Sequence, residues 1–267
     1  MTGTLDLILR SISWQFRYQP AKRVDMDSDK FMQYWTLDSK GIDEPNRRRN
    51  GWSNVQVINP DNGKNPLLYV KKQENYYRRT MAHLLRGITT VENEARSLYY
   101  LSAIGIKIPR ILFWGIRREG NKKQAVLVTE HLQGYQSLAD LLEDWRSGHS
   151  NNINGRRGII LALARELRKM HDAHIVHNSL YPKHIFVNTQ TKELSFIDLE
   201  KAKIRWTRMA CSLRDLDSLN RHTFGISRTD RLRFLMAYCN TKRRTPEVSK
   251  LWKALSQRYK EKIPMTQ

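Results

Sequence analysis

A polar loop between apolar segments holds the first residues whose types and spacing could do chemistry. The loop HNSLYPKHIFVN occupies residues 177–188, and LSFIDLE then places Asp198 at the end of a short apolar strand. An Asp in such a position is most often a turn former. This one lies 19 positions after Ser179 (198 − 179), where it could bind a metal ion, and His184 could bind a metal or a phosphate as a neutral imidazole. The arrangement predicts phosphoryl transfer, in which metal ions neutralise phosphate charge.

The loop also has the outline of a kinase catalytic loop, H-R-D-x-x-x-x-N followed by an apolar strand. His177 falls on the His of this outline and Asn178 on the Arg. Ser179 falls on the Asp, and His184 falls on the Asn. A serine can position an acceptor hydroxyl but accepts its proton poorly, and general-base help is worth about 10²–10⁴ in rate. The loop therefore predicts a larger loss of turnover than of nucleotide binding.

Phosphoryl transfer also needs a lysine on the phosphates and a carboxylate that holds this lysine. In TTVENEARSLYYLSAIG, Glu94 lies on the apolar face of a predicted helix, where a carboxylate needs a cation. The apolar face is formed by Val91, Leu98 and Leu101. An upstream hairpin offers Lys71 and Lys72, which point to opposite faces of their strand. Alternation alone leaves both lysines open as the partner of Glu94.

The phosphate-binding loop is the least developed element, because the chain has no G-x-G-x-x-G. NRRRNGWSN precedes the first strand of the hairpin, and the backbone N–H groups near Gly51 and Ser53 could contact phosphate with help from the arginines. A basic surface turn is the alternative reading of this segment. Glu130 ends the strand AVLVTE, where the helical part begins, and is a further candidate for nucleotide binding.

Charge sets this chain apart, with 47 Lys and Arg against 26 Asp and Glu and a net charge of +21. Such a field attracts polyanions such as nucleic acid, anionic lipid, phosphorylated glycolipid or nucleotide. The basic residues are spread along the chain and form no nucleic-acid-binding signature, so nucleic acid is not the expected partner. A solvated basic surface remains the alternative. Four histidines, from His171 to His184, lack the spacing of a zinc motif.

The order of the predicted elements indicates an α+β fold in two parts. Residues 52–72 read as a hairpin, followed by one capped helix and two further strands up to Glu130. The rest reads as helices with one small hairpin, HIFVN and LSFID. This is the order of a protein-kinase-like, two-lobe fold. We predict an N-terminal extension over residues 1–40, a β-rich N-lobe with one αC-type helix over 41–130 and a helical C-lobe over 131–267.

Two cysteines make no disulfide framework, and the sequence shows no signal peptide or transmembrane segment, which predicts a cytoplasmic location.

Several segments together resemble the lipopolysaccharide kinase (Kdo/WaaP) family and, within it, the InaA-like branch. They run in order from about residue 43 to residue 203, so the resemblance covers the kinase-like body. The segments are DEPNRRRNGWSNVQ, LYVKKQ, TTVENEA, VLVTEHLQGYQSLADL, HNSLYPKHIFV and FIDLEKAK. The joint occurrence of these motifs is specific, although no single one of them is.

The resemblance implies ATP-dependent phosphorylation, with Mg²⁺, of sugars in the lipopolysaccharide inner core at the cytoplasmic face of the membrane. It implies Lys71 as the phosphate lysine, Glu94 as its carboxylate and Asp198 as the metal ligand. Lipopolysaccharide core, or another anionic glycolipid, is the implied partner. The net charge of +21, without a spanning segment, predicts peripheral attachment to an anionic membrane surface. NRRRNGWS becomes a plausible nucleotide loop.

Ser179 marks a departure from members of the family that keep an Asp at this position. The InaA-like branch is similar to this chain in lacking that Asp. The alternative to a sugar kinase is therefore a pseudokinase, a nucleotide- or partner-binding regulator of the acid and stress response. Asp172 and Glu200 are the nearest other carboxylates that could serve as the base.

Overall fold

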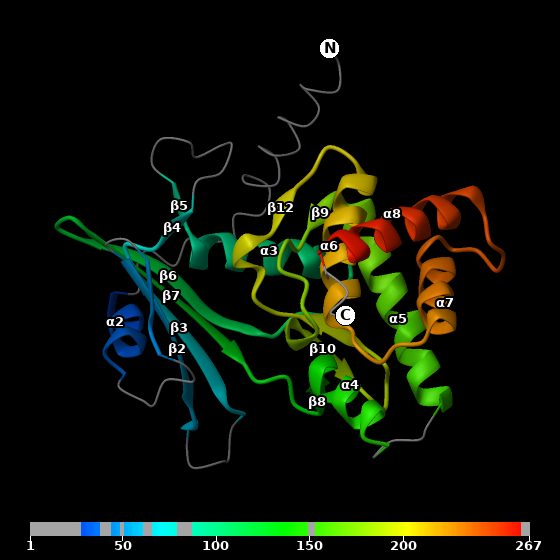
Figure 1. Ribbon diagram of the computed structural model, residues 1–267. Coiled ribbons are helices and arrows are strands. Elements are labelled where there is room, and N and C mark those ends of the chain that lie inside the picture. Colours follow the sequence, from blue (N-terminus) through cyan, green and yellow to red (C-terminus); the bar gives the residue numbers. More distant parts are fainter. Residues whose placement is uncertain are drawn as a thin grey trace. The chain divides into compact units, whose positions relative to one another are not determined.

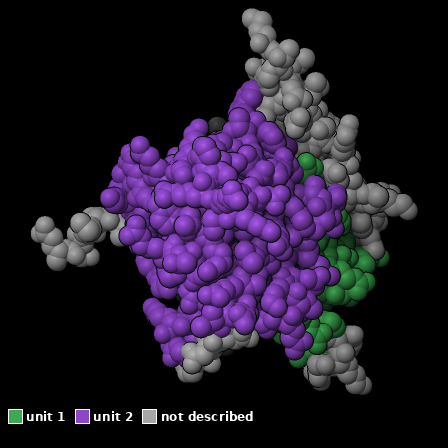
Figure 2. Space-filling view, turned by 90° about the vertical axis from the view of Figure 1, so that its right-hand side faces the viewer, with its two compact units in different colours: residues 1–100, 108–133, 199–201 green, residues 101–107, 134–198, 202–267 purple. Residues whose placement is uncertain are grey.

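The structure is a computed structural model that describes residues 28–37, 44–48, 51–60, 66–78, 87–148 and 153–262. The chain divides into two units, coloured separately in Figure 2. Unit 1 contains residues 1–100, 108–133 and 199–201, and unit 2 contains residues 101–107, 134–198 and 202–267. The boundaries expected at residues 40 and 130 stay predictions, and most of the expected N-terminal extension lies outside the described residues.

Unit 1 is built on a five-stranded antiparallel sheet in the order β1-β2-β3-β7-β6 (Figure 1). Its strands are β1 (Asn46–Arg48), β2 (Gly51–Ile58), β3 (Leu68–Glu74), β6 (Ile111–Glu119) and β7 (Lys122–Glu130). The expected hairpin is confirmed, since β2 and β3 pair in antiparallel register from Trp52–Glu74 to Ile58–Leu68. Most of the polar segment IRREGNKKQ belongs to β6 and β7, which meet in a tight turn at Gly120.

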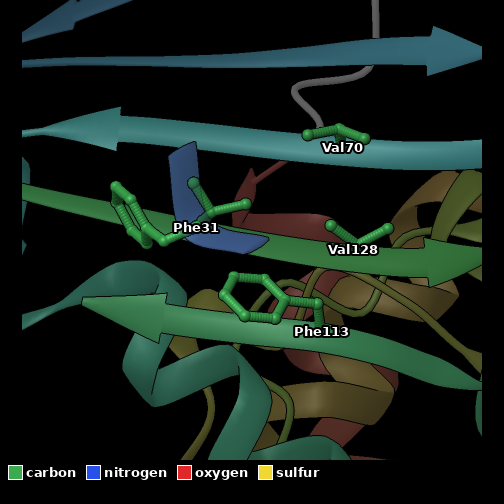
Figure 3. Close-up of a cluster of buried hydrophobic side chains, with 5 residues drawn as sticks. Phe31, Val70, Phe113 and Val128 are labelled. Carbon is green, nitrogen blue, oxygen red and sulfur yellow. The ribbon is translucent and has the colours of Figure 1, made fainter. Parts of the chain in front are cut away.

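One face of this sheet is covered by α2 (Ser28–Thr36). Phe31 of this helix packs against Val70, Phe113, Val126 and Val128 from β3, β6 and β7 (Figure 3). All five side chains are almost fully buried. Because side chains alternate along a strand, the neighbours of Val70 in β3 must point to the opposite face of the sheet.

The opposite face of the sheet carries α3 (Thr90–Ala103), which follows the short ribbon of β4 (Tyr77–Arg78) and β5 (Ile88–Thr89). The Thr89 hydroxyl accepts a hydrogen bond from the backbone N–H of Glu92, as the expected cap requires. After the helix, Gly105 adopts a positive φ of 76°, and the N–H of Ile106 returns to the carbonyl of Leu101. The predicted cap is confirmed, and Gly105 ends the helix in a left-handed conformation.

Unit 2 contains the helices α4 (Leu138–Arg146), α5 (Ile153–Asp172), α6 (Arg208–His222), α7 (Arg228–Tyr238) and α8 (Pro246–Lys262). One face of α5 is buried, since Ile160, Leu163, Leu167 and Met170, spaced three and four residues apart, are all buried. The helix packs against α6 and α7 along this core. Ser137 caps α4 by accepting the N–H of Asp140 at 3.1 Å.

Two small sheets carry the loop segments of unit 2. The expected hairpin is confirmed as β10 (Ile185–Asn188) and β11 (Leu194–Phe196), with β8 (Tyr135–Ser137) on the other side of β10. β9 (Ile175–Val176) pairs with β12 (Lys203–Ile204). The mixed α+β class is therefore confirmed, with strands dominating unit 1 and helices dominating unit 2. Among the described helices, none has the length and apolar content to span a bilayer.

Candidate active-site residues

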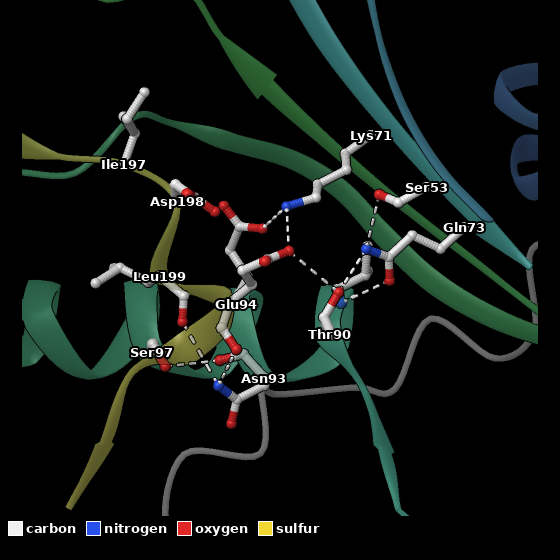
Figure 4. Close-up of polar contacts among 12 residues, drawn as sticks. Ser53, Lys71, Gln73, Thr90, Asn93, Glu94, Ser97, Ile197, Asp198 and Leu199 are labelled. Atoms are coloured by element: carbon white, nitrogen blue, oxygen red, sulfur yellow. Dashed lines mark hydrogen bonds and ion pairs between the residues drawn. The ribbon is translucent and has the colours of Figure 1, made fainter. Parts of the chain in front are cut away.

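Lys71 lies between two carboxylates in unit 1. Its Nζ is 2.7 Å from Oε2 of Glu94 and 3.2 Å from Oε2 of Glu200 (Figure 4). The three side chains are 14%, 9% and 17% exposed, so these ion pairs are largely shielded from water. The predicted pairing of Lys71 with Glu94 is confirmed, and their role in nucleotide binding stays a prediction.

Strand alternation explains why Lys71, and not Lys72, reaches Glu94. Lys72 points to the face covered by α2, and its amine donates to the carbonyl of Leu37 just after that helix. Lys71 and Gln73 point to the face that carries α3. The position of α3 on one face therefore decides a choice that the strand pattern left open.

Gln73 ties the start of α3 to the sheet beside this ion pair. Its Nε2 donates to the hydroxyls of Ser53 and Thr90, and its Oε1 accepts the backbone N–H of Val91 at 3.0 Å. Ser53 is 8% exposed, and its hydroxyl is an acceptor inside this network (Figure 4). Nucleotide binding by Ser53 therefore depends on its backbone and stays a prediction.

Gly51 begins β2 at a very close backbone approach. A Cβ atom at this position would lie 2.3 Å from the carbonyl oxygen of Asn75, so only glycine fits without a backbone shift. This gives Gly51 a packing role, and its expected contact with phosphate stays a prediction. Arg49 and Asn50 of the same candidate loop lie outside the described residues.

Glu200 is a member of this cluster that sequence reasoning considered only as a base. Its backbone carbonyl accepts hydrogen bonds from Arg78 at 2.9 Å and from Asn93 at 3.0 Å. Burial alone would raise the pKa of its carboxyl, but the charge of Lys71, with hydrogen bonds from Lys71 and Thr90, lowers this pKa below its usual value. The signal in the sequence was DLE in place of the usual D-F-G, a carboxylate where a glycine is common.

We expect Lys71→Met to lower the free energy of unfolding by about 3–5 kcal/mol, because it leaves two shielded carboxylates without their cation. Urea denaturation measures this change. Lys122→Met is the matched control, since Lys122 is 60% exposed in the same sheet and its pair with Glu74 should contribute at most about 1 kcal/mol. Adding Glu200→Gln to Lys71→Met should restore part of the loss. Equal losses for the two single variants would contradict this account.

In unit 2, the backbone of Ser179 orders the polar loop. Its carbonyl accepts the Nδ1–H of His184 at 2.9 Å and the N–H of Tyr181 at 2.9 Å. Ser179 is 3% exposed. His184 follows from the 3-10 helix Pro182–His184, whose last N–H returns to the carbonyl of Tyr181. The loop thus keeps a fixed spacing between Ser179 and His184.

Asp198 lies next to His184, with 3.4 Å between its Oδ2 and the Nε2 of the imidazole. Because the Nδ1–H of His184 donates to the carbonyl of Ser179, Nε2 is the ring nitrogen that faces the carboxylate. A ring nitrogen and a carboxylate oxygen that face each other can both bind one metal ion. The pair therefore fits part of a metal site, although the described residues contain no cluster of three or more metal-ligating side chains.

His177 packs inside the loop. It is fully buried, and its Nε2–H donates to the carbonyl of Ile197 at 3.0 Å. Burial lowers the pKa of this imidazole, so the ring stays neutral, with Nδ1 unprotonated. Its ring stacks on that of His184 with centroids 6.1 Å apart.

Asp215 of α6 was not among the residues singled out from the sequence. It holds the polar loop through hydrogen bonds to backbone N–H groups of that loop. Its carboxylate accepts the N–H of His177 at 2.7 Å, the N–H of Asn178 at 2.8 Å and the Nε2 of His171 at 3.2 Å. Asp215 is fully buried. Asn178 has a positive φ of 66°, a backbone strain that these bonds offset. A carboxylate four residues after the buried Cys211 on one helical face was the available signal.

We expect Asp215→Asn to destabilise the protein by about 1–3 kcal/mol, because an amide N–H₂ group would then face backbone N–H donors. Urea denaturation tests the change in stability, and hydrogen exchange tests whether the amides of His177 and Asn178 lose protection. Asp144→Asn on α4 is the control and should leave both amides protected. Unchanged exchange in Asp215→Asn would show that this carboxylate does not hold the loop.

Glu130 and Asp172 already have cationic partners. Glu130 accepts a hydrogen bond from Arg110 at 3.1 Å, but this arginine is 75% exposed, so the pair constrains Glu130 weakly. Its role with nucleotide stays a prediction. Asp172 is bound by Arg168 at 2.8 Å and lies 3.4 Å from Arg208.

Unit 2 also contains an open, mainly apolar cavity of about 760 Å³ among α4, α5, α6, α7 and α8. Its walls are mainly aliphatic and aromatic, with charged groups such as Arg228 and Lys260 at a few points. The apolar walls include Leu138, Trp145, Ile160, Leu163, Leu216, Phe234, Trp252 and Leu255.

Comparison with known proteins gives consistent results. Protein InaA of Escherichia coli (strain K12) is 31% identical over 206 residues, which cover 76% of this chain and 92% of InaA. Lipopolysaccharide core heptose(I) kinase WaaP of Escherichia coli is 25% identical over 60% of this chain, and that of Pseudomonas aeruginosa is 28% identical over 54%. The matches span 64% and 58% of those two kinases.

A solved structure, WaaP in complex with acyl carrier protein, superposes with a TM-score of 0.67 at 24% identity. The superposition covers 91% of this chain and 96% of that WaaP chain. The expected protein-kinase-like fold is thereby confirmed. Residues 32–238 match the lipopolysaccharide kinase (Kdo/WaaP) family. The chain therefore belongs to the lipopolysaccharide kinase (Kdo/WaaP) family.

Proposed function

We propose that this protein is an ATP-dependent kinase that phosphorylates sugars of the lipopolysaccharide inner core. The buried Lys71–Glu94 ion pair carries the proposal, because kinases hold the lysine that binds phosphate with such a carboxylate. The family to which the chain belongs supports it. The two similar proteins that are heptose(I) kinases support a sugar of the core as the acceptor.

Each candidate residue has a defined role in this proposal. Lys71 binds phosphate oxygens of ATP, and Glu94 positions the lysine without touching the nucleotide. Asp198 and His184 hold Mg²⁺, which when bound neutralises charge on the phosphates. Mg²⁺ prefers oxygen ligands, so Asp198 is the stronger ligand of the two. Ser179 orients the acceptor hydroxyl.

Gly51 and Ser53 would contact the nucleotide through backbone N–H groups, and Glu130 would contact it from the end of β7.

Ser179 also favours a second candidate, a pseudokinase that binds nucleotide or a partner as a regulator of the acid and stress response. The catalytic-loop position lacks a carboxylate, and the other two carboxylates considered as bases are engaged by cations. Glu200 is bound by Lys71, and Asp172 is bound by Arg168. In this candidate, nucleotide binding survives and phosphoryl transfer does not.

We expect the wild type to bind ATP with Mg²⁺, and Asp198→Ala to bind about tenfold more weakly, a change of about 1.4 kcal/mol. Calorimetry on the full chain measures both affinities, with Glu261→Ala on α8 as a remote acidic control.

Ser179→Asp should raise phosphoryl transfer to purified core lipopolysaccharide by up to about 10²–10⁴, if the missing base is the only defect.

The outcomes separate the two candidates. Binding of ATP with no transfer by either the wild type or Ser179→Asp would support the regulator. Absence of nucleotide binding in the wild type would end both proposals.

The apolar cavity of unit 2 supports a further partner, an acyl chain presented by an acyl carrier protein. The WaaP structure that shares this fold is a complex with acyl carrier protein. Ligand sites commonly have volumes of about 300–1,000 Å³ and mainly apolar walls, and the cavity among α4 to α8 falls in this range.

We expect acyl carrier protein loaded with a long acyl chain to bind at least about tenfold more tightly than the unloaded carrier. Trp145 and Trp252 line the cavity, so their fluorescence reports entry of the chain. Leu163→Trp should fill the cavity and abolish the difference, and its thermal melt controls for folding. Equal binding of the loaded and unloaded carriers would contradict this partner.

The net charge of +21 supports peripheral attachment to the anionic, cytoplasmic face of the membrane. Screening shortens such attraction to about 10 Å at 0.1 M salt. Flotation with anionic vesicles at low and high salt tests this location, and binding that ignores salt would argue against it.

A further inference from the structure

A strip of basic side chains follows the solvent face of α8 and the loop that leads into this helix. The other face of α8 is buried at Leu251 and Leu255, and the helix packs against α6 and α7 (Figure 1). Lys250, Lys253 and Lys260 share the solvent face, because residues three, four and seven apart lie on one side of a helix. The exposed members of this α8 strip are Lys242, Arg243, Arg244, Lys250, Lys253 and Lys260.

The charge of the α8 strip is not neutralised within the described part of the chain. No ion pair joins its cations to an acid there. The acids of α8 have other contacts, since Glu247 binds an arginine of α6 and Glu261 accepts a hydrogen bond from Gln257. Surface cations of α5 differ, because Arg168 and Lys169 each pair with an acid of their own helix. The strip therefore leaves its positive charge to an external anion.

The positions of these cations do not help α8 to fold. The three cations of residues 242–244 lie just before the N-terminus of the helix, where the helix dipole disfavours positive charge. Lys250 and Lys253 are neighbours on one face of the helix, where like charges repel. Within the strip, Lys260 alone lies in the last turn, where the dipole favours a cation. This arrangement costs the folded chain some stability and favours a role in binding.

The α8 strip suits a lipid surface better than a protein or a nucleic acid. Protein interfaces have an apolar centre in which lysine is depleted. Sites for single-stranded nucleic acid combine cations with aromatic rings that stack on bases. Neither feature is present on the solvent face of α8, because the exposed large hydrophobic side chains of the described chain belong to other segments: Tyr77, Ile153, Trp206 and Phe224. Lysine is a compact, hydrated point charge, and lipid headgroups attract such charges without a paired geometry.

We propose that the α8 strip is the face by which this protein docks on an anionic membrane surface. This inference rests on the proposed peripheral location and adds the face and the residues that carry it. α8 also forms one wall of the apolar cavity of unit 2, through Trp252, Tyr259 and Lys260. Docking through α8 therefore holds this wall of the cavity beside the lipid headgroups.

The experiment measures the affinity of the full chain for vesicles of phosphatidylglycerol and phosphatidylcholine in equal amounts. The salt concentration is about 0.1 M, where the Debye length is about 10 Å, so that only cations close to the lipid contribute. The strip variant replaces four cations by glutamine, a good helix former. Its substitutions are Lys242→Gln, Arg243→Gln, Lys250→Gln and Lys253→Gln. We expect its affinity to fall by about 10²–10³, because each cation near such a surface strengthens binding about fivefold.

A charge-matched control separates the strip from net charge. It replaces four exposed cations of other segments, and its affinity should fall less than about threefold, because screening isolates them from the lipid. Its substitutions are Lys107→Gln, Arg118→Gln, Arg157→Gln and Arg165→Gln. Thermal melts test the folding of both variants. The milder double variant Lys250→Gln/Lys253→Gln should lose about 10–30-fold and tests the strip if the fourfold variant does not fold.

Equal losses in the strip variant and the control, or an unchanged affinity of the strip variant, would overturn the docking face and leave the peripheral location in place. A wild type that does not bind these vesicles would overturn both. A loss confined to acyl carrier protein or to a short single-stranded oligonucleotide would assign the strip to that partner and would also overturn the proposal. Affinity for ATP with Mg²⁺ should be equal in the wild type and the strip variant, so a failure of the kinase function is detected separately.

Discussion

Unit 1 depends most on the ion pairs that the Lys71 amine forms with two largely buried carboxylates. Glu94 lies in the apolar stripe of α3, so the helix can pack on the sheet only if a cation accompanies it. Lys71 supplies this cation from β3, and Glu200 brings the segment 199–201 to the same point. One lysine therefore joins a strand, a helix and a segment more than 100 residues later in the chain.

Unit 2 also buries a carboxylate, but compensates it with different groups. Asp215 is fully buried, and its carboxylate is compensated by two backbone N–H groups and a histidine ring, without an arginine or lysine among these contacts. The bonds hold the backbone at His177 and Asn178, where the chain takes a left-handed conformation. These hydrogen bonds offset the free-energy cost of burying the carboxylate, and they order the loop that carries Ser179.

The backbone bonds that place Ser179 and His184 do not involve the side chain at residue 179. The spacing of Ser179 and His184 therefore rests on hydrogen bonds to backbone groups of the loop.

Periodicity in the sequence by itself determined most elements and several pairings. The capped α3, the hairpin of β2 and β3, the buried face of α5 and the need of Glu94 for a cation all follow from local patterns. Such patterns can be recognised in the sequence because the helix and strand periods repeat within a few residues.

Only the tertiary structure decided which lysine serves Glu94, since Lys71 and Lys72 differ only in the face that α2 or α3 covers. It also decided that Glu200 joins Lys71 and that Asp215 supports the loop from 37 to 38 positions away. These contacts join segments far apart in sequence. Which distant charges pair depends on which segments the fold brings next to each other. A local pattern shows that a buried carboxylate needs a partner, and only the folded chain shows which group arrives.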